Sequence, residues 1–334
     1  MPLILDRNAV LDLHAGAALK KWVIPTFCTE NLTTTEAILS AALRYSKLIS
    51  QPDIPITIAI TNNYSHRSQS VNYTHTRKWD LGLKLFMADV EVLTGKGSPF
   101  EKLHVMMHLD HTQWDTDEEL LNWDMNRFSS IMFDASNLPY EENIARTAAF
   151  VDENGSKIVI EGACDEIVDA TGAETGQLTT PESALKYLNL THADFIVANL
   201  GTEHRANVAD LNYHSDLARQ ISALTGHKLV LHGTSSVGLD QIKNLFNDGI
   251  AKVNIWTTLE RDSSPNLFLD MVNNASKIVG SEKVNHMIAS GLLGNGINKA
   301  GYPSISHYTT TYRQEIIFKR MEHIVLEYLR LWYV

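Results

Sequence analysis

Eight short apolar runs, each rich in β-branched residues, recur along this chain of 334 residues. Each run is nearly continuously apolar, which is typical of parallel strands that are covered on both faces. Polar segments separate the runs, so each run ends as a short strand would. The predicted strands occupy residues 22–27, 55–61, 103–110, 129–135, 157–163, 194–200, 228–233 and 251–256.

Several of the intervening segments carry helix signals. Residues 33–49 open with threonines that can cap a helix, and their apolar side chains recur at helical spacing. The other predicted helices occupy residues 115–125, 139–155, 179–190 and 239–249. Strands that alternate with helices in this way favour an α/β fold, a (β/α)8 TIM barrel; a doubly wound open sheet is the alternative.

Two segments lie outside this alternation. Residues 62–80 are polar and irregular, and we predict a long loop after the second strand. Residues 309–334 predict one amphipathic C-terminal helical extension, whose apolar stripe would pack on the barrel wall or on another subunit. Since no repeat, low-complexity linker or second domain is evident, we assign residues 1–334 to a single TIM-barrel domain.

Charge and composition exclude several classes of partner. The formal net charge of -11 opposes a polyphosphate backbone, so we expect no nucleic acid as partner. No window approaches the roughly 20 apolar residues of a membrane span, and the N-terminus lacks the pattern of a secretory signal. Two cysteines, Cys28 and Cys164, fit a reducing compartment. We therefore predict a cytoplasmic protein that binds no membrane.

Histidines follow three of the predicted strands. The third strand ends in "HVMMHLDH" with His111, His204 follows the sixth strand, and His232 ends the seventh. Because the carboxyl ends of barrel strands converge on one face, these imidazoles can meet around one ion. Three histidines and an open position form an ordinary catalytic zinc site.

Strand geometry separates the histidines of the third strand. Within a regular strand, His108 and Asp110 share one face and His111 lies on the other, unless the strand has already ended. Only positions near the strand end reach the metal. We therefore expect His104 and His108 to be structural, and Asp110 and His111 to be functional.

Four blocks of the sequence resemble a known family. They are "HLDH" (108–111), "SIMFDASNLPYEENI" (130–144), "TTPESALKYLNLTHADFIVANLGTEH" (179–204) and "LVLHGTSSV" followed by "GIAKVNIWT" (229–257). Their order and spacing, from about residue 20 to residue 260, closely resemble the class II, metal-dependent fructose-bisphosphate/tagatose-bisphosphate aldolases. The resemblance implies a lyase that reversibly cleaves a ketose (bis)phosphate to dihydroxyacetone phosphate and an aldehyde.

The resemblance also assigns roles to residues. It implies one Zn²⁺ per chain, with another divalent ion as the alternative and a monovalent cation as a further expectation. Asp110 matches the aspartate that exchanges a proton with the sugar hydroxyl at the cleaved bond, and Asp134 and Glu161 match acids around the metal. The matched zinc ligands are His111, His204 and His232. The matched phosphate-binding positions are Gly233, Ser235, Asn254 and Thr257, and Thr61 and Arg205 are further candidates for contact with substrate.

Physical chemistry agrees with these roles. Cleavage leaves negative charge on the ketone oxygens, which Zn²⁺ would stabilise. The base need only take a proton from the adjacent alcohol, and Asp110 lies next to ligand His111.

The chain departs from the family pattern at four places. Arg205 replaces a glycine after the second zinc histidine, and Ala163 replaces an acid. The loop at 165–176 lacks the usual glycine-rich acidic motif, which leaves Glu174, ahead of Glu166, as the shifted candidate for a catalytic glutamate. Trp256 replaces a small or acidic residue, and no segment after the last strand supplies an arginine for a second phosphate. We expect Arg205 to make the substrate preference differ from that of an ordinary bisphosphate aldolase.

Two alternative functions stay open. One is a non-catalytic or regulatory aldolase-like subunit, which the missing loop acid favours. The other is a metal-dependent aldolase that acts on a carboxylated or non-phosphorylated substrate. For the active enzyme we expect a small sugar phosphate as ligand and a homodimer or homotetramer as the assembly.

Overall fold

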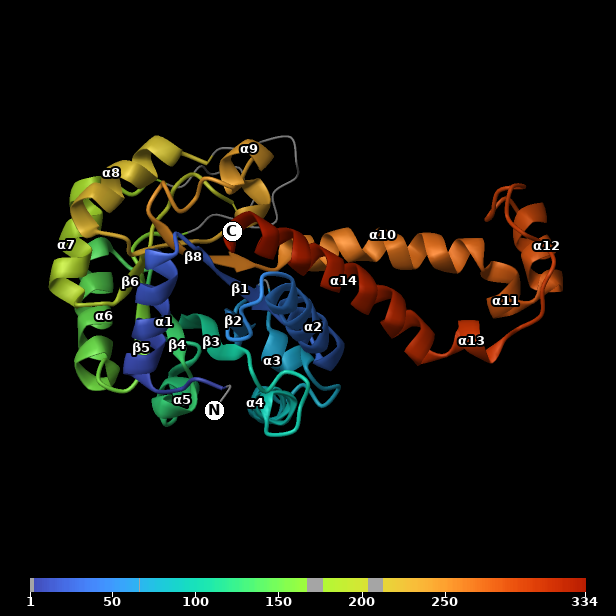
Figure 1. Cartoon of the computed structure of the whole chain (residues 1–334), viewed down its shortest axis with the longest axis horizontal. Helices are drawn as coiled ribbons and strands as arrows, with labels where there is room; N and C mark the ends of the chain where they lie inside the picture. Colours follow the sequence, from blue (N-terminus) through green and yellow to red (C-terminus); the bar gives the residue numbers. More distant parts are fainter. Residues whose placement is uncertain (1–2, 66, 167–176, 204–212) are drawn as a thin grey trace.

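The eight predicted strands form a closed parallel barrel in chain order (Figure 1). The computed structural model describes residues 3–65, 67–166, 177–203 and 213–334. Because β1 pairs with both β2 and β8, the barrel closes and the open-sheet alternative is wrong. The strands are β1 Ile24–Cys28, β2 Pro55–Thr61, β3 His104–Gln113, β4 Ser130–Asp134, β5 Val159–Ala163, β6 Phe195–Val197, β7 Leu229–Leu231 and β8 Ile250–Ile255.

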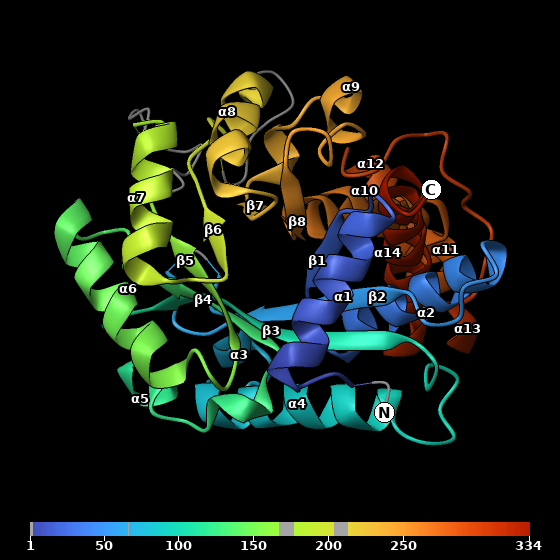
Figure 2. The same ribbon diagram turned by 60° about the vertical axis from the view of Figure 1, so that its left-hand side comes forward.

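Helices surround this barrel and extend beyond it (Figure 2). The helices are α1 Arg7–Leu19, α2 Leu32–Leu48, α3 Gln69–Asn72, α4 Trp79–Thr94, α5 Glu118–Leu121, α6 Tyr140–Asn154, α7 Pro181–Thr191, α8 Ser215–Thr225, α9 Leu239–Ile242, α10 Thr257–Asn273, α11 Ala275–Val279, α12 Ser281–Ala289, α13 Ile305–Tyr308 and α14 Thr310–Trp332, with 3-10 turns η1 Met125–Arg127 and η2 Thr234–Ser236. The predictions for α2, α6, α7 and α14 are confirmed.

Other predicted elements differ from the structure. The helix predicted at 239–249 ends at Ile242, because the following residues close three-residue turns, such as Asn244 N–H to Gln241 and Asn247 N–H to Asn244. The helix predicted at 115–125 is reduced to α5 and η1 for the same reason, with a turn from Trp123 N–H to Leu120. The loop predicted at 62–80 contains α3 and the start of α4.

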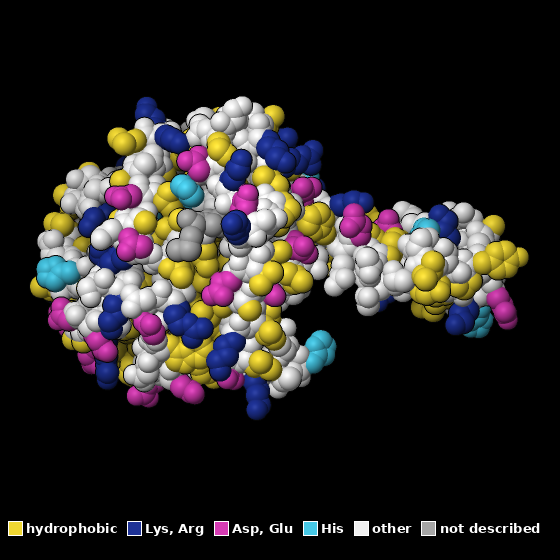
Figure 3. Space-filling model, turned by 60° about the horizontal axis from the view of Figure 1, so that its bottom comes forward, with side chains coloured by type: hydrophobic (Ala, Val, Ile, Leu, Met, Phe, Trp, Pro, Cys, Tyr) yellow, Lys and Arg dark blue, Asp and Glu magenta, His cyan; other side chains and the backbone are white. Residues whose placement is uncertain are grey.

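An arm of helices projects from the barrel (Figures 1 and 3). The long helices α10 and α14 run outward and back, and α11 to α13 lie at the tip; none of the helices between residues 257 and 308 was predicted from the sequence. The C-terminal part of α14 packs on the barrel wall, which is one of the two predicted alternatives. Trp332 Nε1–H donates to the Ile242 carbonyl at 2.8 Å, and the Tyr333 hydroxyl donates to Pro55 at 2.6 Å.

No helix in the described part of the chain combines the length and apolar character that crossing a lipid bilayer requires.

Helices α3 and α4 pack closely at one glycine. A β-carbon at Gly82 of α4 would collide with the carbonyl oxygen of Ser70 in α3, whereas a β-carbon at Gly16 of α1 would meet nothing within 4 Å. We expect Gly82→Ala to lower the free energy of unfolding by about 1–3 kcal/mol, the usual cost of overpacking. Gly16→Ala is the matched control and should raise it by up to about 1 kcal/mol, because alanine favours the helix. Urea unfolding of both variants measures this; equal effects would contradict the close packing.

Glu260, in the first turn of α10, lies in a place where a negative charge is unfavourable. Its Oε1 atom is buried and has no hydrogen-bond partner among the described residues. Burial, and then the charge of Glu30, raises the pKa of Glu260 from 4.5 to about 7. The folded protein therefore binds this proton more tightly than the unfolded chain does.

Stability linked to Glu260 is present in acid and is lost as the pH rises from about 4.5 to about 7. We expect Glu260→Gln to raise the free energy of unfolding at pH 8 by up to about 3 kcal/mol, with little change at pH 4. Thermal unfolding across this pH range measures the difference. Glu119→Gln, at an exposed position of α5, is the control. A gain that does not depend on pH would contradict the assignment.

Candidate metal and substrate site

A bulge in β3 brings Asp110 and His111 to the same place. The pairing of β3 with β4 shifts between Leu109 and Thr112, and His111 has a φ of 45°, in the left-handed region. A bulge adds one residue to a strand and breaks its alternation of faces. The predicted end of this strand at Asp110 is wrong, because β3 continues to Gln113. The bulge, rather than a strand end, therefore lets both side chains face the site.

Three potential metal ligands meet beside the bulge. One ligand atom from each of Asp110, His111 and His232 lies within 4.8 Å of the others, and all three residues are buried. His232 follows β7, and its ring meets that of His111 edge to face, at 4.7 Å between centroids. The structure thus brings together two of the three predicted zinc ligands. The third, His204, lies outside the described residues, as do Arg205 and Glu174.

Asp134 orients the ring of His111. Burial alone would raise the pKa of Asp134, but hydrogen bonds from His111 and Ser136 lower it, so Asp134 is ionised. The ionised Asp134 accepts a hydrogen bond from His111 Nδ1–H at 3.1 Å, so Nε2 is the ring nitrogen that can bind a metal. Tyr64 stacks on the face of the ring, at 4.4 Å between centroids. A carboxylate behind an imidazole is the usual support for a metal-binding histidine, so the donor set fits a divalent transition metal ion.

Asp110 lies ionised between several donors. Arg67 Nη2 lies 2.5 Å from Oδ2, and Asn254 Nδ2–H donates to Oδ1 at 2.8 Å. The Cys28 thiol also points to Oδ2, at 3.3 Å. Burial alone would raise the pKa of Asp110, but nearby His111 and Arg67 hold it well below its usual range. A buried carboxylate that stays charged can accept a proton from a bound alcohol.

Glu161 lies in the barrel interior, paired with a lysine. Lys252 Nζ of β8 is 2.7 Å from Glu161 Oε1 of β5, and both side chains are buried. His108 lies beside them: its Nδ1 is 2.8 Å from Ser130 Oγ, and its Nε2 is 3.3 Å from Lys252 Nζ. The sequence analysis missed Lys252. The signal was a charged residue within an apolar strand, two positions before Asn254.

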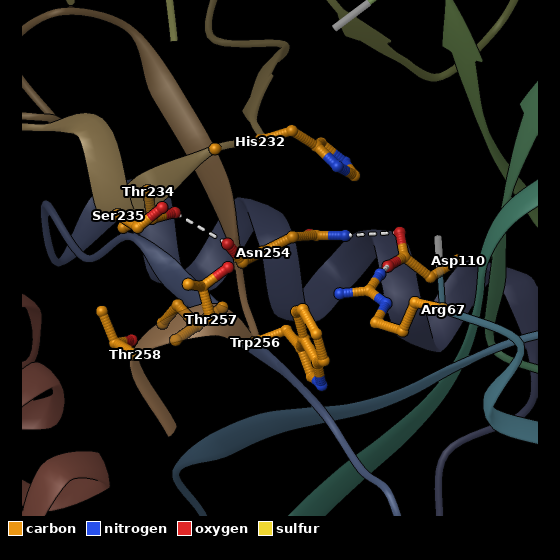
Figure 4. A pocket seen from close by; sticks show the side chains of 11 residues that line it. Arg67, Asp110, His232, Thr234, Ser235, Asn254, Trp256, Thr257 and Thr258 are labelled. Atoms are coloured by element: carbon orange, nitrogen blue, oxygen red, sulfur yellow. Dashed lines mark hydrogen bonds and ion pairs between the residues drawn. The ribbon is translucent and has the colours of Figure 1, made fainter. Parts of the chain in front are cut away.

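The predicted phosphate-binding residues line a pocket next to Asp110 and His232 (Figure 4). Both η2 and α10 begin at this pocket, so their first N–H groups lack partners within the helix. The Ser235 hydroxyl oxygen and Asn254 Oδ1 are buried, with no hydrogen-bond partner in the described part of the chain. The predicted members that line the pocket are Gly233, Ser235, Asn254 and Thr257.

Gly233 shapes this pocket through its backbone. Its φ is 66°, and a β-carbon there would lie 2.8 Å from the Glu203 carbonyl oxygen. Glycine avoids both the strain and the contact. The turn after His232 can therefore lie directly against the segment that ends at Glu203, and Glu203 N–H donates to Ser236 Oγ at 3.0 Å.

Arg67 and Trp256 complete the pocket, and the sequence analysis missed Arg67. The guanidinium carbon lies 5.0 Å from the centre of the Trp256 ring. Thr61 does not line the pocket; its hydroxyl donates to the Arg67 carbonyl, and its N–H donates to Gln69 Oε1 at 2.9 Å. No feature of the polar stretch 62–80 distinguishes Arg67 from the other cations there.

Comparisons with known proteins agree with this geometry. Fructose-bisphosphate aldolase of Giardia intestinalis is 35% identical over 150 residues, which are 43% of this chain and 46% of that protein. Sulfofructosephosphate aldolase of Alkalicoccus urumqiensis is 32% identical over 164 residues, 46% of this chain and 55% of that protein. The chain thus spans about half the length of the curated relatives it matches.

Solved structures share the fold along nearly the whole chain. Fructose-bisphosphate aldolase of Campylobacter jejuni superposes with a TM-score of 0.76 at 17% identity, covering 99% of this chain and 95% of the other. The YdjI aldolase of Escherichia coli K12 gives 0.64 at 19% identity, covering 96% and 95%. Residues 8–292 match the family described as fructose-bisphosphate aldolase class-II. The chain belongs to the class II fructose-bisphosphate aldolase family.

Proposed function

We propose that this protein is a metal-dependent aldolase that reversibly cleaves a ketose phosphate to dihydroxyacetone phosphate and an aldehyde. The observation that carries the proposal is the buried meeting of Asp110, His111 and His232 at the rim of the barrel. Two helix starts line the pocket beside them, together with two polar atoms that have no hydrogen-bond partner among the described residues. A base, a metal site and an anion site therefore lie side by side.

His111, His232 and, by the sequence prediction, His204 would hold one Zn²⁺, with another divalent ion as the alternative. The ion would supply positive charge to stabilise the negative charge that develops on the ketone oxygens. Asp134 fixes the tautomer of His111 through the 3.1 Å hydrogen bond. Tyr64 and the bulge restrict the ring further.

Asp110 is the proposed base. In cleavage it takes the proton of the hydroxyl next to the breaking bond, and in condensation it returns that proton. Asn254 and Arg67 hold its two carboxylate oxygens in the free protein. Glu174 remains the proposed acid or base at the carbon that becomes the nucleophile.

The phosphate of dihydroxyacetone phosphate is proposed to bind at Gly233, Ser235, Asn254 and Thr257. Helix starts favour anions because their N–H groups and the helix dipole point at the ligand. The buried Ser235 hydroxyl offers one more donor. Arg205 and a monovalent cation are further proposed contacts for this phosphate.

The alternatives differ in the fate of the substrate rather than in the fold. A regulatory subunit would keep the pocket without turnover. An enzyme for carboxylated or non-phosphorylated substrates would keep the metal and Asp110. The named relatives include both a fructose-bisphosphate and a sulfofructosephosphate aldolase, so the family accommodates different aldehyde fragments. A cytoplasmic location would suit Cys28 and Cys164, which are buried free thiols.

We expect the metal-loaded protein to release dihydroxyacetone phosphate from at least one member of a panel of ketose 1-phosphates, as measured by a coupled reductase assay. A chelator should abolish the release, and added Zn²⁺ should restore it. Asp110→Asn should lower turnover by about 10²–10⁴-fold, the usual worth of a general base, because the amide keeps the shape without the basic oxygen.

Elemental analysis provides the control for this test. His232→Ala should lose bound metal, whereas Asp110→Asn and His104→Asn should retain it. A metal-loaded protein that releases no dihydroxyacetone phosphate from any substrate would contradict the enzyme and favour the regulatory subunit. If Asp110→Asn turns over substrate at the wild-type rate, Asp110 is not the base.

The arm supports the proposal of a homo-oligomer. Large apolar side chains lie exposed on α10 and around the tip, where Figure 3 shows them gathered at the far end. Exposed apolar clusters of this kind mark association surfaces. We propose that a second copy of the chain covers them. They are Phe268, Leu269, Leu292, Tyr302, Ile305 and Tyr308, with exposed fractions of 46–88%.

We expect sedimentation equilibrium to show a dimer or tetramer. The double variant Leu292→Ser/Ile305→Ser should weaken association at least tenfold, because it removes apolar area from the tip. Leu19→Ser is the matched control, since Leu19 is 89% exposed on α1 of the barrel. A wild-type monomer, or equal effects of the two variants, would refute an interface on the arm.

A further inference from the structure

Arg67 is a buried cation at the edge of the proposed active site. Its side chain is 10% exposed, and Nη2 pairs with Asp110 at 2.5 Å. Its guanidinium carbon lies over the Trp256 ring, 5.0 Å from the ring centre (Figure 4). An isolated buried charge is strongly unfavourable, and the carboxylate and the aromatic face compensate for it. The fold therefore holds this cation in place beside the proposed base.

The guanidinium has hydrogen-bonding capacity that the protein does not use. An arginine side chain carries five N–H donors. Across the described residues, the side-chain acceptor of Arg67 is Asp110 alone, and the buried Nε atom has no acceptor. Buried donors are nearly always paired, so an unused donor at a pocket wall indicates a ligand.

Arg67 lies on the side of the aldehyde fragment. Ser235, Thr257 and Thr258 form one side of the pocket, and Arg67 with Asp110 forms the other (Figure 4). Asp110 is the proposed partner of the hydroxyl at the cleaved bond, so substrate atoms beyond that carbon belong to the aldehyde. Those atoms come within reach of Arg67.

We propose that Arg67 selects an aldehyde fragment that carries an anionic group: a carboxylate, a phosphate or a sulfonate. The proposal rests on the aldolase function above and names the class of its second product. A planar guanidinium matches two oxygens of such a group at once.

The pairing of Asp110 gives a second reason for an anion. Asn254 occupies Oδ1 of Asp110, and Arg67 occupies Oδ2. A substrate hydroxyl that binds at Oδ2 must therefore displace Arg67. An anionic fragment gives Arg67 a new acceptor in exchange, whereas a neutral fragment leaves a buried cation without a partner.

The carboxylate of Glu30 positions both Trp256 and the loop that carries Arg67. Glu30 Oε1 accepts from Trp256 Nε1–H at 2.6 Å and from Gln69 Nε2–H at 2.8 Å. Gln69 lies two residues after Arg67 and accepts from Thr61 N–H. The aromatic face and the loop that carries Arg67 therefore hold a fixed separation.

The test compares ketose 1-phosphates that share the ketone half and end in a carboxylate, a phosphate, a sulfonate or a neutral hydroxymethyl group. We expect the wild type to prefer one of the charged ends. Arg67→Gln should lower kcat/KM for that substrate by about 10–100-fold more than it lowers kcat/KM for the neutral substrate, because the charged substrate alone loses a charged hydrogen bond. Arg67→Lys should fall between them, because it keeps the charge without the fork. Arg77→Gln, an exposed arginine of the same segment, is the matched control.

A binding measurement separates failure of this proposal from failure of the proposed function. Calorimetric titration with glycerate and phosphoglycerate, with and without dihydroxyacetone phosphate, needs no turnover. Weaker binding of the anions by Arg67→Gln, measured at a temperature at which circular dichroism shows the variant to be folded, supports anion recognition even where no substrate is cleaved. Equal losses for charged and neutral substrates, or unchanged anion binding, would overturn it: Arg67 would then only hold Asp110. If dihydroxyacetone phosphate is released and Arg67→Gln has no effect, the proposed aldolase function is supported and the proposed role of Arg67 is contradicted.

Discussion

The site depends on one irregularity, the bulge in β3. In a regular strand, Asp110 and His111 would point to opposite faces of the barrel wall. The positive φ of His111 is sparsely populated for a residue with a β-carbon, so surrounding contacts must hold it. Regular pairing resumes at Thr112 and Gln113, and Gln113 Nε2–H donates to Asp134 Oδ2 at 2.9 Å. The same carboxylate oxygen accepts a hydrogen bond from His111. The strand pairing beyond the bulge therefore helps to hold His111 in its strained conformation.

The barrel interior below this bulge is charged, and its charges form connected pairs. Lys252 and Glu161 pair in one layer, and Asp110 and Arg67 pair nearer to the rim. His108 lies between the pairs, 3.7 Å from Glu161 and 3.9 Å from Asp110. Breaking one buried pair leaves an uncompensated charge, which costs about 3–5 kcal/mol. The polar interior is therefore tied to the stability of the barrel as well as to its chemistry.

The barrel could be predicted because eight continuous apolar runs leave few other folds, and its strands match the predicted ones closely. The meeting of His111 with His232 could be predicted because barrel geometry brings strand ends together. The bulge could not, since nothing in "HLDH" reports a backbone angle. The helices α10 to α13 of the arm were missed because they are exposed on several sides and lack a strong apolar stripe: Phe268 and Leu269 of α10 are adjacent, rather than on a shared helical face with the core.

Trp256 and Arg67 support each other in the pocket, and neither role is evident from one residue alone. From the sequence alone, Trp256 was a departure from the family pattern, and Arg67 was one polar loop residue among many. In the structure, Arg67 lies over the Trp256 ring while Glu30 holds the indole N–H. An acidic residue at position 256 would compete with Asp110 for the guanidinium, and a small one would leave it without an aromatic face. The aromatic residue thus makes the arginine tolerable, and the arginine gives the pocket the positive charge that no segment after β8 supplies.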